Sequence, residues 1–311
     1  MQSLSARIVS ALLCFVFHSP LINNSELSNK AGSRTKDNKS HYKPSKEFNY
    51  SVHQLNCVNY EVLEPRHKGN GKVILMLHGG SYKIKLIDMY RRLAERYSRT
   101  LNYCTVYNLD YRIFPQHKHP AQIEDTVSLY NEMISRGISA KDIVIIGDSA
   151  GANLALTSTL YMRDKGIELP CAIVCLSLWG DMTNSGSSFT ENCYRDPFSG
   201  IAKRKSIADN LDYLRRISAY AKELDRTNPY VSPSFANFTG FPPITLICGE
   251  AEMGRSDSEF AYKNMKKSDV DAELHMFEGM FHDFQLLPFF PESKAVYEII
   301  KNRILKTPCN F

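Results

Sequence analysis

Apolar runs of strand length alternate with stretches of helical period along most of the chain. A continuous apolar run is typical of a strand buried on both faces, and alternation with helices is typical of a parallel sheet. The runs predict strands at residues 72–78, 103–109, 142–146, 172–178, 244–248 and 272–277. The intervening patterns predict helices at about 86–99, 121–135, 150–165, 256–267 and 292–305. We therefore expect an α/β fold, with a mainly parallel central sheet flanked by helices.

A long insertion separates the fourth and fifth of these strands, at about residues 181–242. Within it, residues 207–224 carry an apolar stripe at helical spacing. The stripe fits a helix that faces the core. It equally fits a lid, because insertions at the carboxyl edge of a parallel sheet lie above the ligand crevice. We expect the insertion to form a small helical cap.

The N-terminus has the pattern of a targeting segment. Arg7 precedes an apolar stretch at residues 8–17, which is short for a membrane-spanning helix of about 20 residues. The pattern predicts a signal peptide at residues 1–20 and hence a secreted protein, with membrane association through this segment as an anchor as the alternative. Residues 21–47 are polar and predict a poorly ordered spacer, so the folded domain is expected at residues 48–311.

Composition indicates a single globular domain. Hydrophobic residues make up 43% of the 311 residues and charged residues 23%, which suffices for a sizeable core. The net charge is +5, but much of the excess lies between Lys30 and Lys46, so we expect no surface for nucleic acid. No cysteine and histidine spacing resembles a zinc site, and no metal or other cofactor is expected. Four cysteines in apolar runs are expected as buried thiols: Cys104, Cys171, Cys175 and Cys248.

The segment from Val144 to Leu156 carries the most informative motif of the chain. A β-branched run leads into a Gly-x-Ser-x-Gly sequence centred on Ser149, and an Ala- and Leu-rich helical pattern follows. This context is that of a nucleophile elbow, in which a tight turn exposes a serine hydroxyl above the sheet. Gly147 and Gly151 remove side chains that would collide with the neighbouring strand and helix. Ser149 is therefore the candidate nucleophile.

A serine hydroxyl is a poor nucleophile at neutral pH, so Ser149 needs a base and the base needs an orienting acid. In folds built on this elbow the chain order is serine, acid, histidine, and only His275 and His282 follow Ser149. His275 falls within the last predicted strand, whereas His282 falls in the loop that leaves it. His282 is therefore the candidate base.

The acid is expected in the loop after the fifth predicted strand, where three carboxylates compete. Glu250 follows the strand too closely to turn toward His282. Asp257 suits the first turn of the next helix, where its charge favours the amino end. Glu252 is therefore the candidate acid, which would hold the imidazole tautomer and stabilise the imidazolium.

A second glycine motif runs from His78 to Tyr82, directly after the first predicted strand. Consecutive glycines let backbone amides approach an oxyanion without a Cβ in the way. We expect an oxyanion hole made of the amides of Gly79, Gly80 and Ala150, the last at the start of the helix after the nucleophile. His78 is expected to hold the glycine loop.

In combination these motifs resemble the hormone-sensitive-lipase-like family of α/β-hydrolases, especially its acetyl-hydrolase and esterase members. The resemblance spans about residues 72–305 and rests on motifs in the family's order: His78-Gly79-Gly80, Tyr111-Arg112, residues 120–125, residues 147–154, Ser177-Leu178-Trp179, Asp196-Pro197, residues 228–233 and Phe241-Pro242-Pro243. It implies an α/β-hydrolase fold with Ser149 as nucleophile, Glu252 as acid, His282 as base, and Gly79, Gly80 and Ala150 as the oxyanion hole.

The chain departs from the family's pattern in three places. Ser81 stands where the family usually has a third glycine, and it would narrow the acyl pocket or add a hydroxyl contact. Glu252 is one methylene longer than the usual aspartate. The pair Gly254-Arg255 replaces a usually apolar pair, which changes the packing beneath the acid.

The resemblance implies hydrolysis of a small-molecule substrate, a short- to medium-chain acyl ester, through an acyl-enzyme on Ser149 and without a cofactor. An amidase, a formamidase or a lactonase would use the same triad, and the motifs do not separate these activities. A non-catalytic binding protein on this fold is a further alternative, although such proteins commonly lose a triad member and none is lost here. The sequence does not indicate the oligomeric state.

Overall fold

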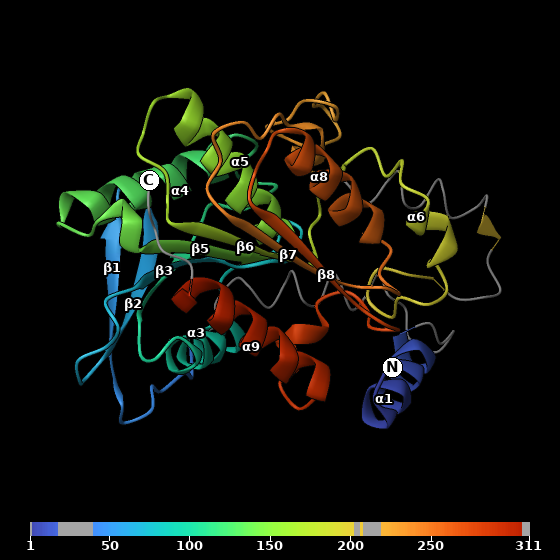
Figure 1. The fold of residues 1–311 in the computed structure, drawn as a ribbon, viewed down its shortest axis with the longest axis horizontal. Helices are drawn as coiled ribbons and strands as arrows, with labels where there is room; N and C mark the ends of the chain where they lie inside the picture. The colour runs from blue at the N-terminus through green and yellow to red at the C-terminus, as the bar shows by residue number, and fades with distance from the viewer. Residues whose placement is uncertain (1, 18–39, 202–205, 208–218, 307–311) are drawn as a thin grey trace.

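The computed structural model describes residues 2–17, 40–201, 206–207 and 219–306. Its centre is an eight-stranded sheet with the strand order β1-β2-β4-β3-β5-β6-β7-β8 (Figure 1). The strands are β1 Phe48–Leu55, β2 Val58–Pro65, β3 Val73–Leu77, β4 Thr105–Asp110, β5 Ile143–Asp148, β6 Ala172–Leu176, β7 Ile244–Gly249 and β8 Ala272–Phe277. Strands β3 to β8 pair in parallel, and the β1–β2 hairpin joins β4 antiparallel. The predicted α/β fold with a mainly parallel sheet is confirmed.

The β1–β2 hairpin extends the sheet beyond the predicted strands. Leu55 pairs with Val58, so two residues join the strands, and Asn56 takes the positive φ of 53° that a tight connection favours. Asparagine tolerates this conformation, but the connection lacks the glycine that marks many hairpins. The outer strand β1 is mostly half-buried or exposed, so it also lacks the continuous apolar run that indicates the other strands.

The apolar runs correspond to strands that are covered on both faces. Every residue of β3, β5 and β7 is buried. Helices α3 and α9 lie on one face of the sheet, and α4, α5 and α8 lie on the other (Figure 1). These helices are α3 Asp88–Thr100, α4 Ala121–Ser135, α5 Ala150–Asp164, α8 Arg255–Lys267 and α9 Pro291–Lys306. Among the described strands, β8 pairs with β7 alone, at the edge of the sheet, and it is half-buried along most of its length.

The insertion at residues 181–242 lies only partly within the described residues. Its described part includes the short helix α6 (Ser188–Glu191). Most of the predicted apolar stripe at residues 207–224 lies outside the described residues. Near the end of that stripe, Tyr220 is buried and stacks on Tyr82 of the glycine loop, with ring centroids 4.3 Å apart. This part of the insertion therefore packs over the loop that follows β3.

The predicted targeting segment contains helix α1 (Leu4–Phe17). Ala6 of this helix is fully buried, and Gln2 Nε2 donates a hydrogen bond to the carbonyl of Gly279 at 2.8 Å. The N-terminal segment therefore packs against the loop that follows β8. Across the described ranges, no helix has both the length and the apolar character that crossing a membrane requires.

Residues 40–47 of the predicted spacer are attached to α3, whereas residues 18–39 lie outside the described part of the chain. Tyr42 Oη donates a hydrogen bond to Glu95 at 2.8 Å, and Glu47 forms an ion pair with Arg99 at 2.6 Å. Ordered contacts with the folded domain therefore begin before Phe48.

Three of the four cysteines predicted as buried thiols are buried and free: Cys104, Cys175 and Cys248. Cys171 corrects the prediction, because it is disulfide-bonded. It lies one position before β6, at the amino-terminal edge of the sheet and not within the strand. The apolar run therefore did not show that Cys171 lies outside the strand, just before its first residue.

Candidate active site

Ser149 lies at the sharp turn between β5 and α5, in a strained backbone conformation with φ 52° and ψ −116°. The turn leaves no room for side chains on either side of it. A Cβ on Gly147 would lie 2.3 Å from the carbonyl oxygen of Gly151, and a Cβ on Gly151 would lie 2.0 Å from that of Leu77. Both glycines are therefore a steric requirement of the turn that presents Ser149.

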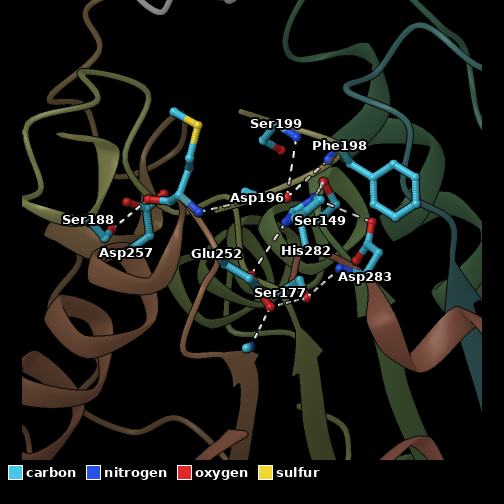
Figure 2. Close-up of polar contacts among 12 residues, drawn as sticks. Ser149, Ser177, Ser188, Asp196, Phe198, Ser199, Glu252, Asp257, His282 and Asp283 are labelled. Carbon is cyan, nitrogen blue, oxygen red and sulfur yellow. Dashed lines mark hydrogen bonds and ion pairs between the residues drawn. The ribbon is translucent and has the colours of Figure 1, made fainter. Parts of the chain in front are cut away.

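Three side chains from the carboxyl ends of different strands meet at this turn (Figure 2). Ser149 follows β5, Glu252 follows β7 and His282 follows β8. Ser149 Oγ lies 2.9 Å from His282 Nε2, and Glu252 Oε2 lies 3.4 Å from His282 Nδ1. The structure thus brings together the three side chains that the sequence predicts as nucleophile, acid and base.

The carboxylate of Glu252 is completely buried, and two further donors hold it. Its Oε1 accepts hydrogen bonds from Ser177 Oγ at 2.7 Å and from the Gly249 amide at 2.5 Å. The other oxygen is left to face His282. Because an acceptor at Nδ1 keeps the proton of the neutral ring there, Nε2 presents its lone pair to Ser149.

The residues that compete with this assignment have other partners. Glu250 accepts a hydrogen bond from a backbone amide of the loop after β8. Asp257 lies in the first turn of α8, as predicted, and accepts hydrogen bonds from the backbone amides of Gly180 and Asp181, where the insertion begins. His275 lies within β8, where it faces a carboxylate of its own strand. The described contacts of His282 are therefore with Glu252 rather than with Glu250 or Asp257.

The first part of the insertion supports the acid loop. Asn192 Nδ2 donates hydrogen bonds to the carbonyls of Glu250 and Glu252, both at 2.8 Å. The buried carboxylate of Asp196 accepts a hydrogen bond from the Met253 amide at 3.1 Å. The insertion therefore fixes the backbone on both sides of the Glu252 side chain.

The pair Gly254-Arg255, where the family usually has apolar residues, joins the insertion to α8. Gly254 directly precedes the first turn of α8. Arg255 forms ion pairs with Glu191 of α6 at 2.7 Å and with Glu259 at 3.4 Å. Ionic contacts therefore stand where the resemblance leads one to expect apolar packing.

The glycine loop after β3 offers a different set of amides from the predicted one. The amide of Gly79 is engaged within the protein, since it donates to Tyr90 Oη at 2.9 Å and to Asp148 Oδ1 at 3.2 Å. This engagement corrects the prediction that Gly79 is an oxyanion donor. A Cβ here would lie 2.3 Å from Asp148 Oδ2, so the glycine serves close packing instead.

Three other amides near the nucleophile donate no hydrogen bond to another described residue: those of Gly80, Ser81 and Ala150. Gly80 and Ser81 have positive φ values of 108° and 54°, which turn the backbone away from regular structure. The amides of Gly80 and Ala150 belong to the predicted oxyanion hole, whereas the amide of Ser81 does not. Ser81 could have been identified from the sequence, because it stands where the family usually has a third glycine.

His78 is buried beneath the glycine loop, where it supports the loop as predicted. Its ring stacks on Tyr111 with centroids 4.2 Å apart, and its Nδ1 lies 2.9 Å from the carbonyl of Gly79. Burial lowers the pKa of His78 to about 4, so the ring is neutral at physiological pH. A neutral ring that donates from Nδ1 to Gly79 holds the loop without adding a charge.

Ser177 is a functional residue that the triad reasoning missed. It follows β6, and its Oγ donates to Glu252 Oε1 at 2.7 Å while accepting a hydrogen bond from the Asp283 amide at 3.0 Å. It therefore links the acid to the loop that carries His282 (Figure 2). The available signal is a polar residue near the carboxyl end of a predicted buried strand, which is where parallel sheets place their sites.

The electrostatic environment favours a charged His282. Burial lowers its pKa, but the charge of Asp283 and the hydrogen bond to Glu252 outweigh burial and raise the pKa of His282 above its usual value. Asp283 Oδ2 lies 3.3 Å from Nε2, the same nitrogen that faces Ser149. Burial raises the pKa of Asp283 above its usual value. Carboxylates therefore face both ring nitrogens of His282.

The other buried carboxylates around the triad have donors of their own. Asp148 accepts a hydrogen bond from Tyr90 Oη at 2.7 Å, and Asp196 accepts one from the Phe198 amide at 3.2 Å. These hydrogen bonds fix the two carboxylates around His282.

Within the described ranges of the chain, no group of three or more His, Cys, Asp or Glu residues could hold a metal ion.

Comparison with known proteins agrees with this geometry. The chain matches the family described as alpha/beta hydrolase fold over residues 74–286, and it belongs to that family. It is 29% identical over 231 residues to an acetyl-hydrolase of Streptomyces hygroscopicus, covering 74% of each chain. It is 29% identical over 225 residues to an esterase of Acinetobacter venetianus, covering 72% of this chain and 71% of the relative.

A solved structure extends the likeness to almost the whole chain. It is the crystal structure of an esterase from the bacterial hormone-sensitive lipase family, with a TM-score of 0.82 at 28% identity. The match covers 98% of this chain and 99% of that chain. The hormone-sensitive-lipase-like resemblance is thus confirmed, and the fold and the relatives define a carboxylester hydrolase of the serine type.

Proposed function

We propose that the protein hydrolyses carboxylic esters through an acyl-enzyme formed on Ser149. The observation that carries the proposal is the 2.9 Å contact between Ser149 Oγ and His282 Nε2, with Glu252 behind the imidazole. His282 takes the proton of Ser149 as Oγ attacks the ester carbonyl, and then gives it to the leaving alcohol. Water activated by His282 repeats the sequence on the acyl-enzyme, which releases the acid and restores Ser149.

The amides of Gly80, Ser81 and Ala150 are the proposed oxyanion donors. The Ala150 amide lies at the amino end of α5, where the helix dipole also favours negative charge. In comparable enzymes the loss of one such donor reduces transition-state stabilisation by about 3 kcal/mol. Fixed amides are effective because they need no reorganisation as the charge develops.

Short- to medium-chain acyl esters are the proposed substrates. Ser149 is only 7% exposed, and the Trp179 amide donates a hydrogen bond to its carbonyl at 3.4 Å. Tyr82 contacts both Trp179 and Tyr220, with ring centroids 6.2 and 4.3 Å apart. The aromatic side chains of the glycine loop and the insertion thus pack together with the side chain of Trp179, whose amide contacts Ser149, and this packing favours a small acyl group. The acetyl-hydrolase relative, and a similar structure of EstE5 soaked with p-nitrophenyl butyrate, support this size range.

An amidase, a formamidase or a lactonase remains the alternative within the same mechanism, because each of these substrates presents an acyl carbon to Ser149. A non-catalytic binding role is disfavoured. The nucleophile, the base and the acid are all present and in contact, which a binding function does not require.

A panel of p-nitrophenyl esters from acetate to laurate tests the proposal, with N-formyl and lactone substrates assayed beside it. We expect turnover of the short esters and a steep decline as the acyl chain lengthens. A fluorophosphonate should label the wild type covalently and leave Ser149→Ala unlabelled. Turnover of only the N-formyl or lactone substrates would favour the alternative. An unlabelled wild type would contradict the acyl-enzyme.

Secretion and membrane association, both inferred from residues 1–20, remain predictions. The contacts that Gln2 and Ala6 make with the folded domain favour retention of α1 in the mature protein, because cleavage would remove them. The intact mass of the protein isolated from its own cells tests this. An intact N-terminus supports retention, and a product lacking about the first 20 residues supports a cleaved leader.

A further inference from the structure

A second carboxylate lies beside the reactive nitrogen of the base. Asp283 directly follows His282, and its Oδ2 lies 3.3 Å from His282 Nε2. Ser149 Oγ lies 2.9 Å from the same nitrogen, so the hydroxyl and the carboxylate share one ring position (Figure 2). Glu252 reaches only the opposite nitrogen, Nδ1. The triad already has its acid in Glu252, so the triad does not explain why a second carboxylate lies beside Nε2.

Several contacts hold Asp283 in this place. Its backbone is left-handed, with φ 57° and ψ 27°, a conformation that Asp and Asn tolerate better than most residues. Its amide donates to Ser177 Oγ at 3.0 Å, and its Oδ1 accepts a hydrogen bond from Gln285 Nε2 at 3.2 Å. The Asp283 side chain is only 16% exposed. Together these contacts direct the second oxygen of its carboxylate at His282.

The charged side chains that approach His282 are negative. Four carboxylates approach it from different elements. Three are buried, namely Asp148 at the end of β5, Asp196 in the insertion and Glu252 after β7, and the fourth is the partly buried Asp283 in its own loop. Within the described ranges, none of the four forms an ion pair with a lysine or arginine. Asp148 and Asp196 are engaged with other donors, so only Glu252 and Asp283 face the ring directly.

We propose that Asp283 is a positioning residue that accepts the Nε2 proton of the His282 imidazolium in a charge-assisted contact and thereby sets the pH range in which His282 acts as a base. The inference rests on the proposed function of Ser149 and His282. No bond is made or broken at Asp283. The proton stays on Nε2 between its departure from Ser149 and its delivery to the leaving alcohol, and the carboxylate stabilises the ring while it is charged.

The direction in which Asp283 shifts the pH dependence follows from the form of the His282 ring that acts as a base, which is the neutral imidazole. A nearby negative charge favours the imidazolium, which cannot accept a proton, so a larger fraction of His282 is inactive as a base at low pH. This agrees with the direction of the pKa of His282, which the charge of Asp283 raises against the lowering effect of burial. Removing the charge at Asp283 should therefore extend activity to lower pH.

The test is the pH dependence of kcat/KM for p-nitrophenyl acetate in the wild type and in Asp283→Asn. Asparagine keeps the size of the side chain and tolerates the left-handed backbone, so folding should be preserved. We expect the acidic limb of the profile to move to lower pH by about one unit or more, as is typical of a charge within about 4–6 Å. Activity on the alkaline plateau should stay within about tenfold of the wild type, because the triad is intact.

Glu273→Gln is the matched control, since it removes a carboxylate 3.0 Å from His275, a histidine outside the site. Its pH profile should match that of the wild type. A wild type inactive on all esters would defeat the proposed function. A wild type that is active, with an unshifted limb in Asp283→Asn, would overturn this inference alone. A uniform loss of activity at every pH would do the same, because it would indicate a purely structural role.

The titration of the His282 ring in NMR spectra, assigned by its loss in His282→Gln, gives a second readout that does not depend on turnover. The ring should titrate at lower pH in Asp283→Asn than in the wild type. An identical titration in the two proteins would also overturn the inference.

Discussion

Two histidines near the end of the chain lie beside carboxylates, and only one belongs to a site. His275 Nε2 lies 3.0 Å from Glu273, which is closer than the 3.4 Å between His282 Nδ1 and Glu252. The His275 pair is on the edge strand β8, and its two side chains are 34% and 42% exposed. The Glu252 carboxylate is completely buried. A short contact therefore does not by itself mark a functional pair.

The difference lies in what surrounds each pair. In water an exposed pair contributes little, because solvent screens the charges and the side chains remain free to move. Around His282, donors from two other elements fix the acid, and Ser149 occupies the second ring nitrogen. Burial and a complete set of partners convert a histidine and a carboxylate into a base with a defined tautomer.

The largest expected effect separates the two histidines themselves. His282→Ala removes the base, and we expect kcat for p-nitrophenyl acetate to fall by about six orders of magnitude, as in another serine hydrolase. His275→Ala should leave kcat unchanged, because its ring lies on β8 beside Glu273 of the same strand and outside the site. Steady-state kinetics on both variants, with circular dichroism as the folding control, measure the difference. Near-wild-type turnover in His282→Ala would show that His282 is not the base.

The next effect separates two carboxylates of the acid loop region. Glu252→Ala should reduce kcat by about three to four orders of magnitude, because the imidazole loses its orienting acceptor. Asp257→Ala should lower the free energy of unfolding by about 1–3 kcal/mol, since two buried amides lose their acceptor, with far less effect on kcat. Kinetics and urea denaturation of both variants distinguish the outcomes. The reverse order of kcat values would move the acid to Asp257.

These two contrasts concern the residues that the sequence could identify. Each triad member is marked by local information: Ser149 by flanking glycines, Glu252 and His282 by loops that leave predicted strands. The acceptor of the Gly79 amide could not be found in this way, because the Tyr90 hydroxyl that accepts its hydrogen bond lies on α3. Contacts between elements depend on packing, which a local pattern does not encode. The same limit hid the β1–β2 hairpin, which shows neither a continuous apolar run nor a turn glycine.

A smaller effect tests the support behind the buried pair. Ser177→Ala removes one donor to Glu252 and the acceptor of the Asp283 amide. We expect kcat to fall by about tenfold, because the loss of one hydrogen bond to a charged group is worth at least about 1.5 kcal/mol and Gly249 still holds the carboxylate. The measurement is kcat for p-nitrophenyl acetate at the alkaline plateau. Unchanged kcat would mean that Glu252 is positioned without Ser177.

The smallest effect is expected at the exposed pair, and it is the sharpest check of the comparison. Glu273→Gln removes the carboxylate 3.0 Å from His275, which also lies 3.2 Å from Arg303. Because Glu273 is 42% exposed, the free energy of unfolding should change by no more than about 1 kcal/mol, and kcat should not change. Urea denaturation at neutral pH measures the first quantity. A loss of unfolding free energy well above that value would show that the exposed contact between Glu273 and His275 is strong. Burial would then no longer explain why the site is built around His282 and not around His275.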